Sequence, residues 1–419
     1  MKNKEKKEEY ELIFQMPSEI TQPFIIDMVI NGGYDEFLYI FEKNNPNAEM
    51  YLSNDSQKIL AENGLSLFSS EKNIQSLLQQ EKRLSKIIDD FLQTIPLEKV
   101  KNNDSVWLKN NLINYYKYFS DYCKIYRFTE VIYSPLVDKT IKDFVTKHIE
   151  DKNLINHALS VLLNPSVKEK IVKEREKILS QLKANKNIIY LCESVRTIGK
   201  EKLSMRNNIN NYWGFFESVL DEIAKKLFLS PAQAKSLFCG ELVKILEKNK
   251  DINEDLLDKV NKRSELFVAK KENGKYHYYT GIEAQKIRKL IRREIKENIT
   301  EITGDVASVG YAKGRVIILP VGIGKEGKEK LKQKMMTMKK GDILVAATTG
   351  PEMIMACRKA TAIVAEEGGI NSHAAIISRE LEIPGIVNTK IATKVLHDGD
   401  IIEVDANKGI IKILKKYGK

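Results

Sequence analysis

The chain has 419 residues, a length that allows two or more domains, each with its own buried core. Hydrophobic residues make up 42% and charged residues 30%, as in ordinary globular proteins, and no apolar run approaches the roughly 18 residues that a membrane span needs. The net charge of +11 comes mainly from lysines spread through helical stretches, without zinc-finger spacing or an aromatic RNA-binding motif, so we expect solvated helix faces and neither a nucleic-acid nor a membrane partner.

The first residues are charged and lack the long apolar core and the small-residue cleavage site of a secretory signal, so we expect a cytoplasmic protein. The four cysteines lie far apart and form no CxxC pair. This spacing argues against both a disulfide framework and a zinc site, and it predicts reduced, mostly buried thiols and no bound metal. The four are Cys123, Cys192, Cys239 and Cys357.

Residues 1 to 303 are predicted to be predominantly α-helical, because apolar residues recur there at spacings of three and four. Ser230 and Pro231 fit an N-cap followed by proline at the first helical position. Two short runs around Asn273-Gly274 predict a β-hairpin with an NG turn. The helical stretches are Ile74 to Phe91, Val167 to Leu182, Trp213 to Leu227 and Glu283 to Ile299, and the hairpin strands are Leu266 to Lys270 and Tyr276 to Thr280.

The pattern changes after Thr303, where short β-branched runs bounded by turn residues alternate with helical pieces. The sequence therefore predicts an α+β protein with two domains, a mostly helical one at 1–303 and a small α/β one at 304–419. The expected strands are Arg315 to Leu319, Ile343 to Ala347, Thr361 to Ala365, Gly385 to Val387, Ile401 to Val404 and Ile410 to Leu414. The expected helices between them are Lys328 to Met338, Glu352 to Lys359 and Ser372 to Leu381.

The segment around His373 has the pattern of a strand, a Gly368-Gly369 turn and a helix that a proline ends. Asn371 or Ser372 is the expected N-cap, which places the imidazole in the first helical turn, beside backbone N–H groups without helical partners. The positive helix end disfavours imidazolium and would favour a bound phosphoryl group, while the two glycines let a bulky donor approach. These properties suit a phosphoryl acceptor.

The local pattern leaves a second role open, because a histidine in a first helical turn can equally be a capping or packing residue. Glu366 and Glu367 could tune its pKa, but solvated loop carboxylates are the default expectation. Arg358 and Arg379 are candidates for binding phosphate, although Arg379 could instead pair with Glu382.

A set of separated motifs in the C-terminal part is more specific than the histidine alone. The set consists of Gly304-Asp-Val-Ala-Ser-Val-Gly-Tyr-Ala-Lys-Gly314, Gly341-Asp-Ile-Leu-Val345, Thr349-Gly-Pro351, Arg358-Lys-Ala-Thr-Ala-Ile-Val364, Gly368-Gly-Ile-Asn-Ser-His-Ala-Ala-Ile-Ile-Ser-Arg-Glu380, Ile383-Pro384 and His397-Asp-Gly-Asp400. It closely resembles the mobile phosphohistidine domain that phosphoenolpyruvate synthase, pyruvate phosphate dikinase, rifampin phosphotransferase and enzyme I of the sugar phosphotransferase system share. The resemblance spans residues 304 to 415.

The resemblance implies a β/β/α swivelling domain in which His373 carries the phosphoryl group. From the local pattern, we expect phosphate-binding or positioning roles for a further set of residues: Gly368, Gly369, Asn371, Ser372, Arg358 and Arg379. Phosphoenolpyruvate synthases usually have threonine where this chain has Asn371, and often arginine where it has Ile370. Asparagine still offers a short polar group, so we interpret the difference as altered positioning of the ring.

In the complete enzymes, this domain moves between a nucleotide-grasping domain and a second site. A phosphoenolpyruvate barrel takes about 250 residues, whereas about 46 follow His373, and residues 1 to 300 show no Gly-rich phosphate hairpin. We therefore expect neither a barrel nor an ATP-grasp fold here. The helical part contains the stretch around Arg196 and Arg206, the helix junction from Leu220 to Pro231, and Tyr279-Thr-Gly-Ile-Glu-Ala284. With these it resembles, less specifically, the region before the mobile domain in rifampin phosphotransferase and in stand-alone relatives of phosphoenolpyruvate synthase. It could therefore bind the acceptor, with Arg206, Tyr212 and Trp213 as lining or core residues.

The resulting hypothesis is a phosphotransferase component that relays a phosphoryl group through His373, between a nucleotide or phosphoenolpyruvate and a small-molecule acceptor. A separate ATP-grasp protein would charge the histidine, as in multi-subunit relatives such as phenylphosphate synthase, and Mg²⁺ would accompany the nucleotide there; no cofactor is expected on this chain. The main alternative is a non-catalytic binding or regulatory protein that keeps the domain as a scaffold. Nucleic-acid binding through the basic helices is a third, and it predicts a steep salt dependence.

Overall fold

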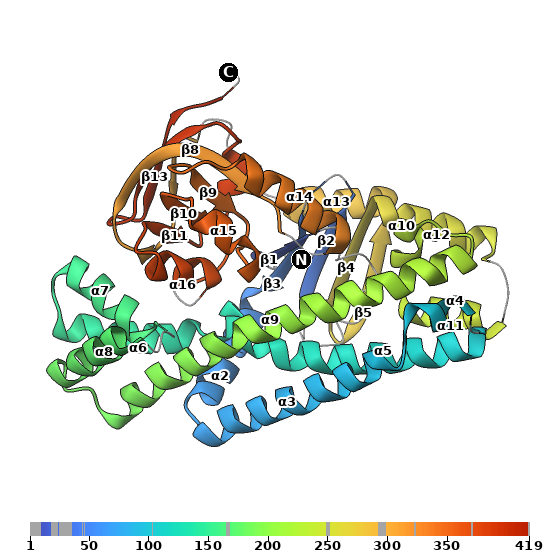
Figure 1. Cartoon of the computed structure of the whole chain (residues 1–419), viewed down its shortest axis with the longest axis horizontal. Helices are drawn as coiled ribbons and strands as arrows, with labels where there is room; N and C mark the ends of the chain where they lie inside the picture. Colours follow the sequence, from blue (N-terminus) through green and yellow to red (C-terminus); the bar gives the residue numbers. More distant parts are fainter. Residues whose placement is uncertain are drawn as a thin grey trace, which may run out of the picture. The chain divides into compact units, whose positions relative to one another are not determined.

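The computed structural model describes residues 10–17, 24, 36–43, 45, 47–102, 104–164, 168–248, 252–291, 299–321, 324–369 and 372–417. A mostly helical N-terminal region is followed by a C-terminal region built on a mixed β-sheet, which confirms the predicted fold class (Figure 1). Within the described parts of the chain, no helix is both long enough and apolar enough to cross a membrane.

The elements agree with most of the predicted helices and strands. The described helices are α2 (Asn54–Phe68), α3 (Glu71–Gln93), α4 (Leu97–Asn102), α5 (Ser105–Tyr126), α6 (Pro135–His148), α7 (Lys152–Leu162), α8 (Glu169–Gln181), α9 (Lys186–Lys226), α10 (Pro231–Lys235), α11 (Cys239–Lys248), α12 (Glu254–Glu265), α13 (Gly281–Ile291), α14 (Gly324–Thr337), α15 (Ile354–Cys357), α16 (His373–Glu380) and α17 (Ala392–Val395). The strands are β1 (Tyr10–Pro17), β2 (Phe37–Glu42), β3 (Asn47–Ser53), β4 (Leu266–Glu272), β5 (Lys275–Thr280), β6 (Glu301–Thr303), β7 (Asp305–Ser308), β8 (Tyr311–Leu319), β9 (Ile343–Ala346), β10 (Ala362–Ala365), β11 (Gly385–Val387), β12 (Ile401–Asp405) and β13 (Ile410–Lys415).

The chain forms two compact units that are interleaved in sequence. The first unit consists of residues 1–60, 77–128 and 208–293, and the second consists of residues 61–76, 129–207 and 294–419. The domain boundary predicted near residue 303 stays a prediction. Helix α9 contributes its N-terminal half to the second unit and its C-terminal half to the first.

The first unit contains a five-stranded antiparallel sheet in the order β1-β3-β2-β4-β5. The predicted hairpin is confirmed as β4 and β5, and both Asn273 and Gly274 have positive φ, as an NG hairpin turn requires. Strands β1 to β3 were not predicted. Strand β2 is buried along almost its whole length, so its sequence lacks the alternation of polar and apolar residues by which a strand can be recognised. Such an apolar run cannot be distinguished from part of a buried helix.

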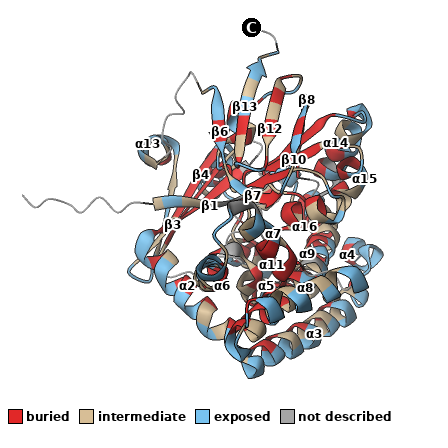
Figure 2. Cartoon of the chain, turned by 90° about the vertical axis from the view of Figure 1, so that its left-hand side faces the viewer, coloured by how far each residue is buried: buried red, intermediate tan, exposed pale blue. Residues whose placement is uncertain are grey.

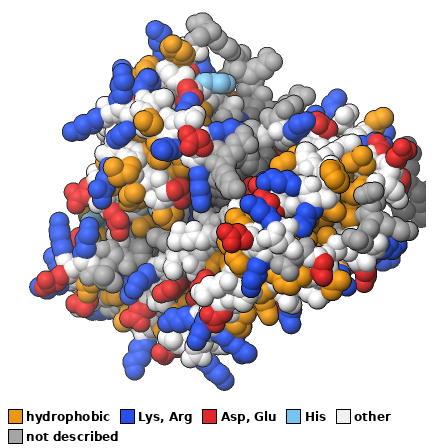
Figure 3. All heavy atoms as spheres, turned by 45° about the vertical axis from the view of Figure 1, so that its right-hand side comes forward, with side chains coloured by type: hydrophobic (Ala, Val, Ile, Leu, Met, Phe, Trp, Pro, Cys, Tyr) orange, Lys and Arg blue, Asp and Glu red, His pale blue; other side chains and the backbone are white. Residues whose placement is uncertain are grey.

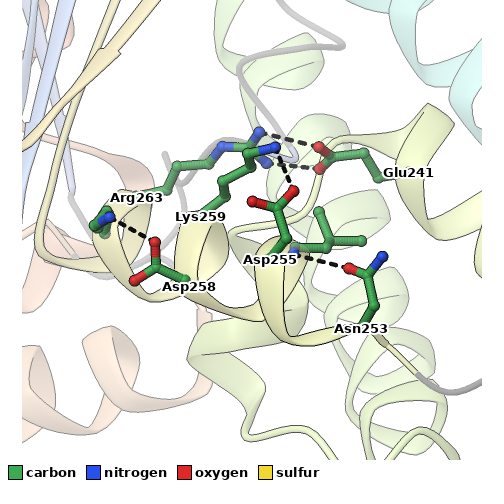
Figure 4. A network of polar contacts seen from close by, with 8 residues as sticks. Glu241, Asn253, Asp255, Asp258, Lys259 and Arg263 are labelled. Atoms are coloured by element: carbon green, nitrogen blue, oxygen red, sulfur yellow. Dashed lines mark hydrogen bonds and ion pairs between the residues drawn. The ribbon is translucent and has the colours of Figure 1, made fainter.

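A network of charged side chains joins α11 to α12 in the first unit (Figure 4). Both terminal nitrogens of Arg263 donate to Glu241, at 2.6 and 3.0 Å, and its guanidinium lies 4.2 Å from the Phe238 ring centroid. Asn253 caps α12 by accepting a hydrogen bond from the Leu256 amide at 2.9 Å. The arginine therefore has a bidentate carboxylate partner and an aromatic face.

The second unit contains an eight-stranded sheet in the order β6-β13-β12-β8-β9-β10-β11-β7. Its centre, β8-β9-β10-β11, is parallel, and all the other pairs are antiparallel. Along β9, Leu344 and Ala346 enter the core on one face, while Ile343 and Val345 enter the core on the other. Burial on both faces explains the continuous apolar runs in these strands, and Figure 2 shows the sheet strands largely in the buried colour.

Helix α16 packs against β7, β10 and β11 in the same unit. The four cysteines are buried and unpaired, as predicted. On the face that Figure 3 shows, Lys and Arg side chains are interspersed with Asp and Glu and do not gather into a single patch.

Candidate functional site

His373 is the first residue of α16, and Ser372 is its N-cap. The Ser372 hydroxyl accepts a hydrogen bond from the Ala375 amide at 3.3 Å, and the Ser372 amide donates to the Gly369 carbonyl at 2.9 Å. Of the two expected N-caps, the structure thus shows Ser372, while Asn371 lies outside the described residues. The imidazole is held in the first helical turn, directly after the glycine turn.

The imidazole has a side-chain partner that was not predicted. Thr349 Oγ1 lies 2.8 Å from His373 Nδ1, within hydrogen-bond distance. The two residues lie in the segments that follow β9 and β10, parallel neighbours in which Ala346 pairs with Ala365. The contact therefore forms where the carboxyl ends of adjacent parallel strands meet, which is a common place for binding sites in such sheets.

Arg206 on α9 supports this threonine. Its Nη1 atom donates to the Thr349 carbonyl at 3.0 Å and to the Thr348 hydroxyl at 3.3 Å. Both acceptors are neutral, and no ion pair of Arg206 is found in the described parts of the chain. The guanidinium is thus bonded to the backbone of the same residue whose hydroxyl contacts His373.

The environment favours the neutral form of the imidazole. Burial is the main cause that lowers the pKa of His373 to about 4, and the positive charge of Arg206 lowers it further. The sequence predicts a neutral imidazole because of the positive helix end, whereas burial and a neighbouring cation are the causes found here. As a whole residue, His373 is partly buried.

The glycine turn before the helix has a steric explanation at Gly368. Its φ of +97° is in the region that favours glycine, and a Cβ atom at this position would lie 2.3 Å from the Ser372 Cβ. A side chain at residue 368 would therefore displace the N-cap of the helix that carries His373.

Comparison with known proteins identifies this part of the chain. Residues 338–409 match the family model described as PEP-utilising enzyme, mobile domain. These residues form a mobile domain of the PEP-utilising enzymes. The resemblance found in the sequence is thereby confirmed for the segment that contains both Thr349 and His373.

Several phosphoenolpyruvate synthases are similar to a part of the chain. A probable phosphoenolpyruvate synthase of Archaeoglobus fulgidus is 41% identical over 127 residues, which are 29% of this chain and 16% of that protein. The phosphoenolpyruvate synthase of Pyrococcus furiosus is 41% identical over 118 residues, or 28% and 13% of the two chains. The uncharacterized phosphotransferase YvkC of Bacillus subtilis is 37% identical over 133 residues, or 32% and 15%. The match therefore covers less than a sixth of the length of each of these relatives.

Neither of the two predicted arginines contacts the imidazole in the described parts of the chain. Arg358 is exposed at the C-terminal end of α15. Arg379 donates from Nε to the Ala375 carbonyl at 2.9 Å and from Nη1 to the Ser160 carbonyl at 3.4 Å, and burial lowers its pKa to about 10. A phosphate-binding role for either arginine stays a prediction.

Glu366 and Glu367 are expected from the sequence to be solvated loop carboxylates. This prediction is wrong for Glu366. This side chain is buried, and its Oε1 accepts hydrogen bonds from the amide and hydroxyl of Thr393 at 2.6 and 2.7 Å. Burial raises the pKa of Glu366, and burial together with the nearby Glu130 raises that of Glu367 well above the usual range. Both carboxyl groups thus favour their protonated forms more than solvated ones do.

The three candidate lining residues of the helical region separate into two groups. Tyr212 and Trp213 are buried core residues of the first unit, while Arg206 belongs to the second unit, beside the mobile-domain histidine. Among the described residues, no cluster of three or more His, Cys, Asp or Glu side chains is placed to hold a metal ion.

Proposed function

We propose that this chain relays a phosphoryl group through His373, from a nucleotide or phosphoenolpyruvate to a small-molecule acceptor. The observation that carries the proposal is the 2.8 Å contact between Thr349 Oγ1 and His373 Nδ1. When Nδ1–H donates to this oxygen, the lone pair resides on Nε2, which then is the nucleophile. The low pKa keeps that lone pair unprotonated at neutral pH.

The charging step follows from this tautomer. Nε2 attacks the phosphorus of the donor, a new N–P bond forms, and the P–O bond to the leaving group breaks with its electron pair. In the phosphorylated ring, the proton stays on Nδ1, which continues to donate its hydrogen bond to Thr349 Oγ1. In the discharging step, the N–P bond breaks, its electron pair returns to Nε2, and the phosphoryl group passes to the acceptor.

The relatives support the class of reaction, since they are named as phosphoenolpyruvate synthases and as a phosphotransferase. We place the charging site on a separate ATP-grasp protein, where Mg²⁺ accompanies the nucleotide. Movement of the mobile domain between that partner and the acceptor completes the relay.

The test is to incubate the protein with labelled ATP and candidate ATP-grasp partners, or with labelled phosphoenolpyruvate. The expected product is an acid-labile, base-stable label that is absent in His373→Ala. His397→Ala is a matched control, because this histidine is an exposed residue of the same domain, before β12. If no donor labels the wild-type protein, the domain is a non-catalytic scaffold and the proposal is wrong.

A further inference from the structure

A cavity lies between two helices of the second unit, α8 and the first half of α9 (Figure 1). Its lining positions recur at spacings of three and four residues, so one face of each helix forms a wall. The cavity has a volume of about 540 Å³, which is in the range of sites that bind small molecules. All of its described lining residues lie between residues 172 and 196, outside the mobile domain.

Two arginines on these walls bind backbone carbonyls at the end of α7. Arg175 donates from Nη2 to the Asn164 carbonyl at 2.6 Å, and Arg196 donates from Nη1 to the Leu162 carbonyl at 3.4 Å. Arginines near a helix C-terminus commonly bind its last carbonyls. This role uses only one of the five N–H donors of Arg196. Among the described residues, its guanidinium has no other hydrogen bond and no ion pair.

The two guanidinium groups repel each other. Burial is the main cause that lowers the pKa of Arg175 to about 10, and the positive charge of Arg196 lowers it further. Burial also lowers the pKa of Arg196. The carbonyls that the two arginines bind are neutral, so they do not cancel this repulsion. A bound oxyanion would cancel it, because guanidinium groups donate paired hydrogen bonds to such a group.

The other charged residues of the lining limit the charge of the anion. Glu176 and Glu193 are exposed, and neither forms an ion pair with Arg196. Together with Lys183 and the two arginines, the lining has three positive and two negative side chains. The excess of one positive charge matches a carboxylate better than a phosphate group, which has close to two negative charges at neutral pH.

The uncharged part of the lining is mostly apolar. It consists of Ser180 and four half-buried apolar residues, which are Val172, Leu179, Ala184 and Ile189. Partly exposed apolar side chains gain free energy when an apolar ligand covers them. The cavity therefore combines two arginines with an apolar surface large enough for a small molecule.

We infer that this cavity binds a small monocarboxylic acid with an apolar body, whose carboxylate group contacts Arg175 and Arg196. The site is separate from His373 and does not depend on the proposed phosphoryl relay, because its described lining residues all belong to α8, α9 and the turn between them. Such a ligand would place its negative charge between the two cations and its hydrocarbon part against the apolar residues.

The test measures binding of hexanoate, as the probe, to the full-length protein by isothermal titration calorimetry. Hexanol has no charge and hexylamine has the opposite charge, so we expect both to bind at least about tenfold more weakly. Inorganic phosphate supplies an anion without an apolar body and should also bind more weakly. His373→Ala should bind hexanoate like the wild type, which separates this site from the phosphoryl relay.

Two variants change the cavity in different ways. Arg196→Gln removes a partly exposed cation and should weaken hexanoate binding about tenfold, the effect of losing a hydrogen bond to a charged group. Lys177→Gln is the matched control, because it removes an exposed cation of α8 that does not line the cavity. Ser180→Phe keeps both arginines but fills the space, so it should abolish binding.

Wild-type affinity in either Arg196→Gln or Ser180→Phe would overturn the inference. No saturable binding of hexanoate to the wild-type protein would do the same. Tighter binding of phosphate than of hexanoate would show that the charge balance of the lining does not select a monocarboxylate. Loss of hexanoate binding in His373→Ala would show that the probe binds at the histidine instead.

Discussion

Two arginines of this molecule differ in what they bind, and the difference separates a structural role from a chemical one. In the first unit, Arg263 meets both oxygens of Glu241 and the face of Phe238, so its charge is neutralised locally. In the second unit, the hydrogen-bond acceptors of Arg206 are the neutral oxygens of Thr348 and Thr349. An arginine whose charge is not neutralised by a bonded carboxylate can stabilise negative charge that arrives during a reaction.

The largest expected effect is on stability, at Arg263. Arg263→Ala leaves Glu241 without its bidentate partner, and because this carboxylate remains partly exposed we expect a loss of about 2 kcal/mol, below the range for a fully buried pair. Chemical unfolding measures this loss. Loading of His373 by phosphoramidate in the native protein should not change. A variant that unfolds like the wild type but loads poorly would reverse the assignment of roles.

The second effect is on transfer, at Arg206. Arg206→Ala removes the cation beside the imidazole, so we expect about tenfold slower transfer of the phosphoryl group from phosphoramidate to His373, equivalent to about 1.4 kcal/mol. The unfolding free energy should fall by less than it does in Arg263→Ala. Equal transfer rates in the two arginine variants would remove the distinction between them.

A smaller effect is expected at the threonine between Arg206 and the histidine. Thr349→Val keeps the shape of the side chain but cannot hydrogen-bond to Nδ1, so the ring is free to turn and to change tautomer. We expect about fivefold slower loading of His373, equivalent to one hydrogen bond of about 1 kcal/mol. Thr349→Ser retains the hydroxyl and should load at nearly the wild-type rate; if serine is as slow as valine, the hydroxyl is not the important group.

The smallest effect concerns the pKa of His373, which an NMR titration of the imidazole measures. The wild-type value should be about 4. Arg206→Ala should raise it, since a neighbouring cation disfavours imidazolium, but burial should keep it below the usual histidine value. As pH falls, the variant therefore loses its nucleophilic lone pair at a higher pH than the wild type does. Arg263→Ala should leave the titration unchanged.

The sequence predicted the parallel strands of the second unit well, because their signal is local. Runs such as Ile343 to Val345 are apolar throughout, short, and bounded by turn residues, which fits strands buried on both faces. Strands β1 to β3 lack such signals. The strand β2 pairs with β4, more than 200 residues away, and nothing in its own sequence specifies that partner.

The same limit applies to the site. The position of His373 at the start of a helix and the role of Ser372 as N-cap follow from neighbouring residues, so sequence reasoning could reach them. The contact with Thr349 spans 24 residues, and that of Arg206 with Thr349 spans 143. These groups are brought together by the pairing of β9 with β10 and by the contact with α9. The local sequence around each residue contains no information about that pairing or that contact.

The register of β9 and β10 also bears on how the loop before His373 can vary. Thr349 and His373 both project from segments anchored on adjacent strands, so sheet pairing fixes where those segments begin. Helix α16 is independently fixed by its packing on β7, β10 and β11. Glu366 and Glu367 continue the pairing of β9 with β10, because their amides donate to the Ala346 and Ala347 carbonyls, so residues inserted between β10 and the Gly368 turn would break these hydrogen bonds. The length of the segment between β10 and the glycine turn is therefore as strictly fixed as the register of the two strands.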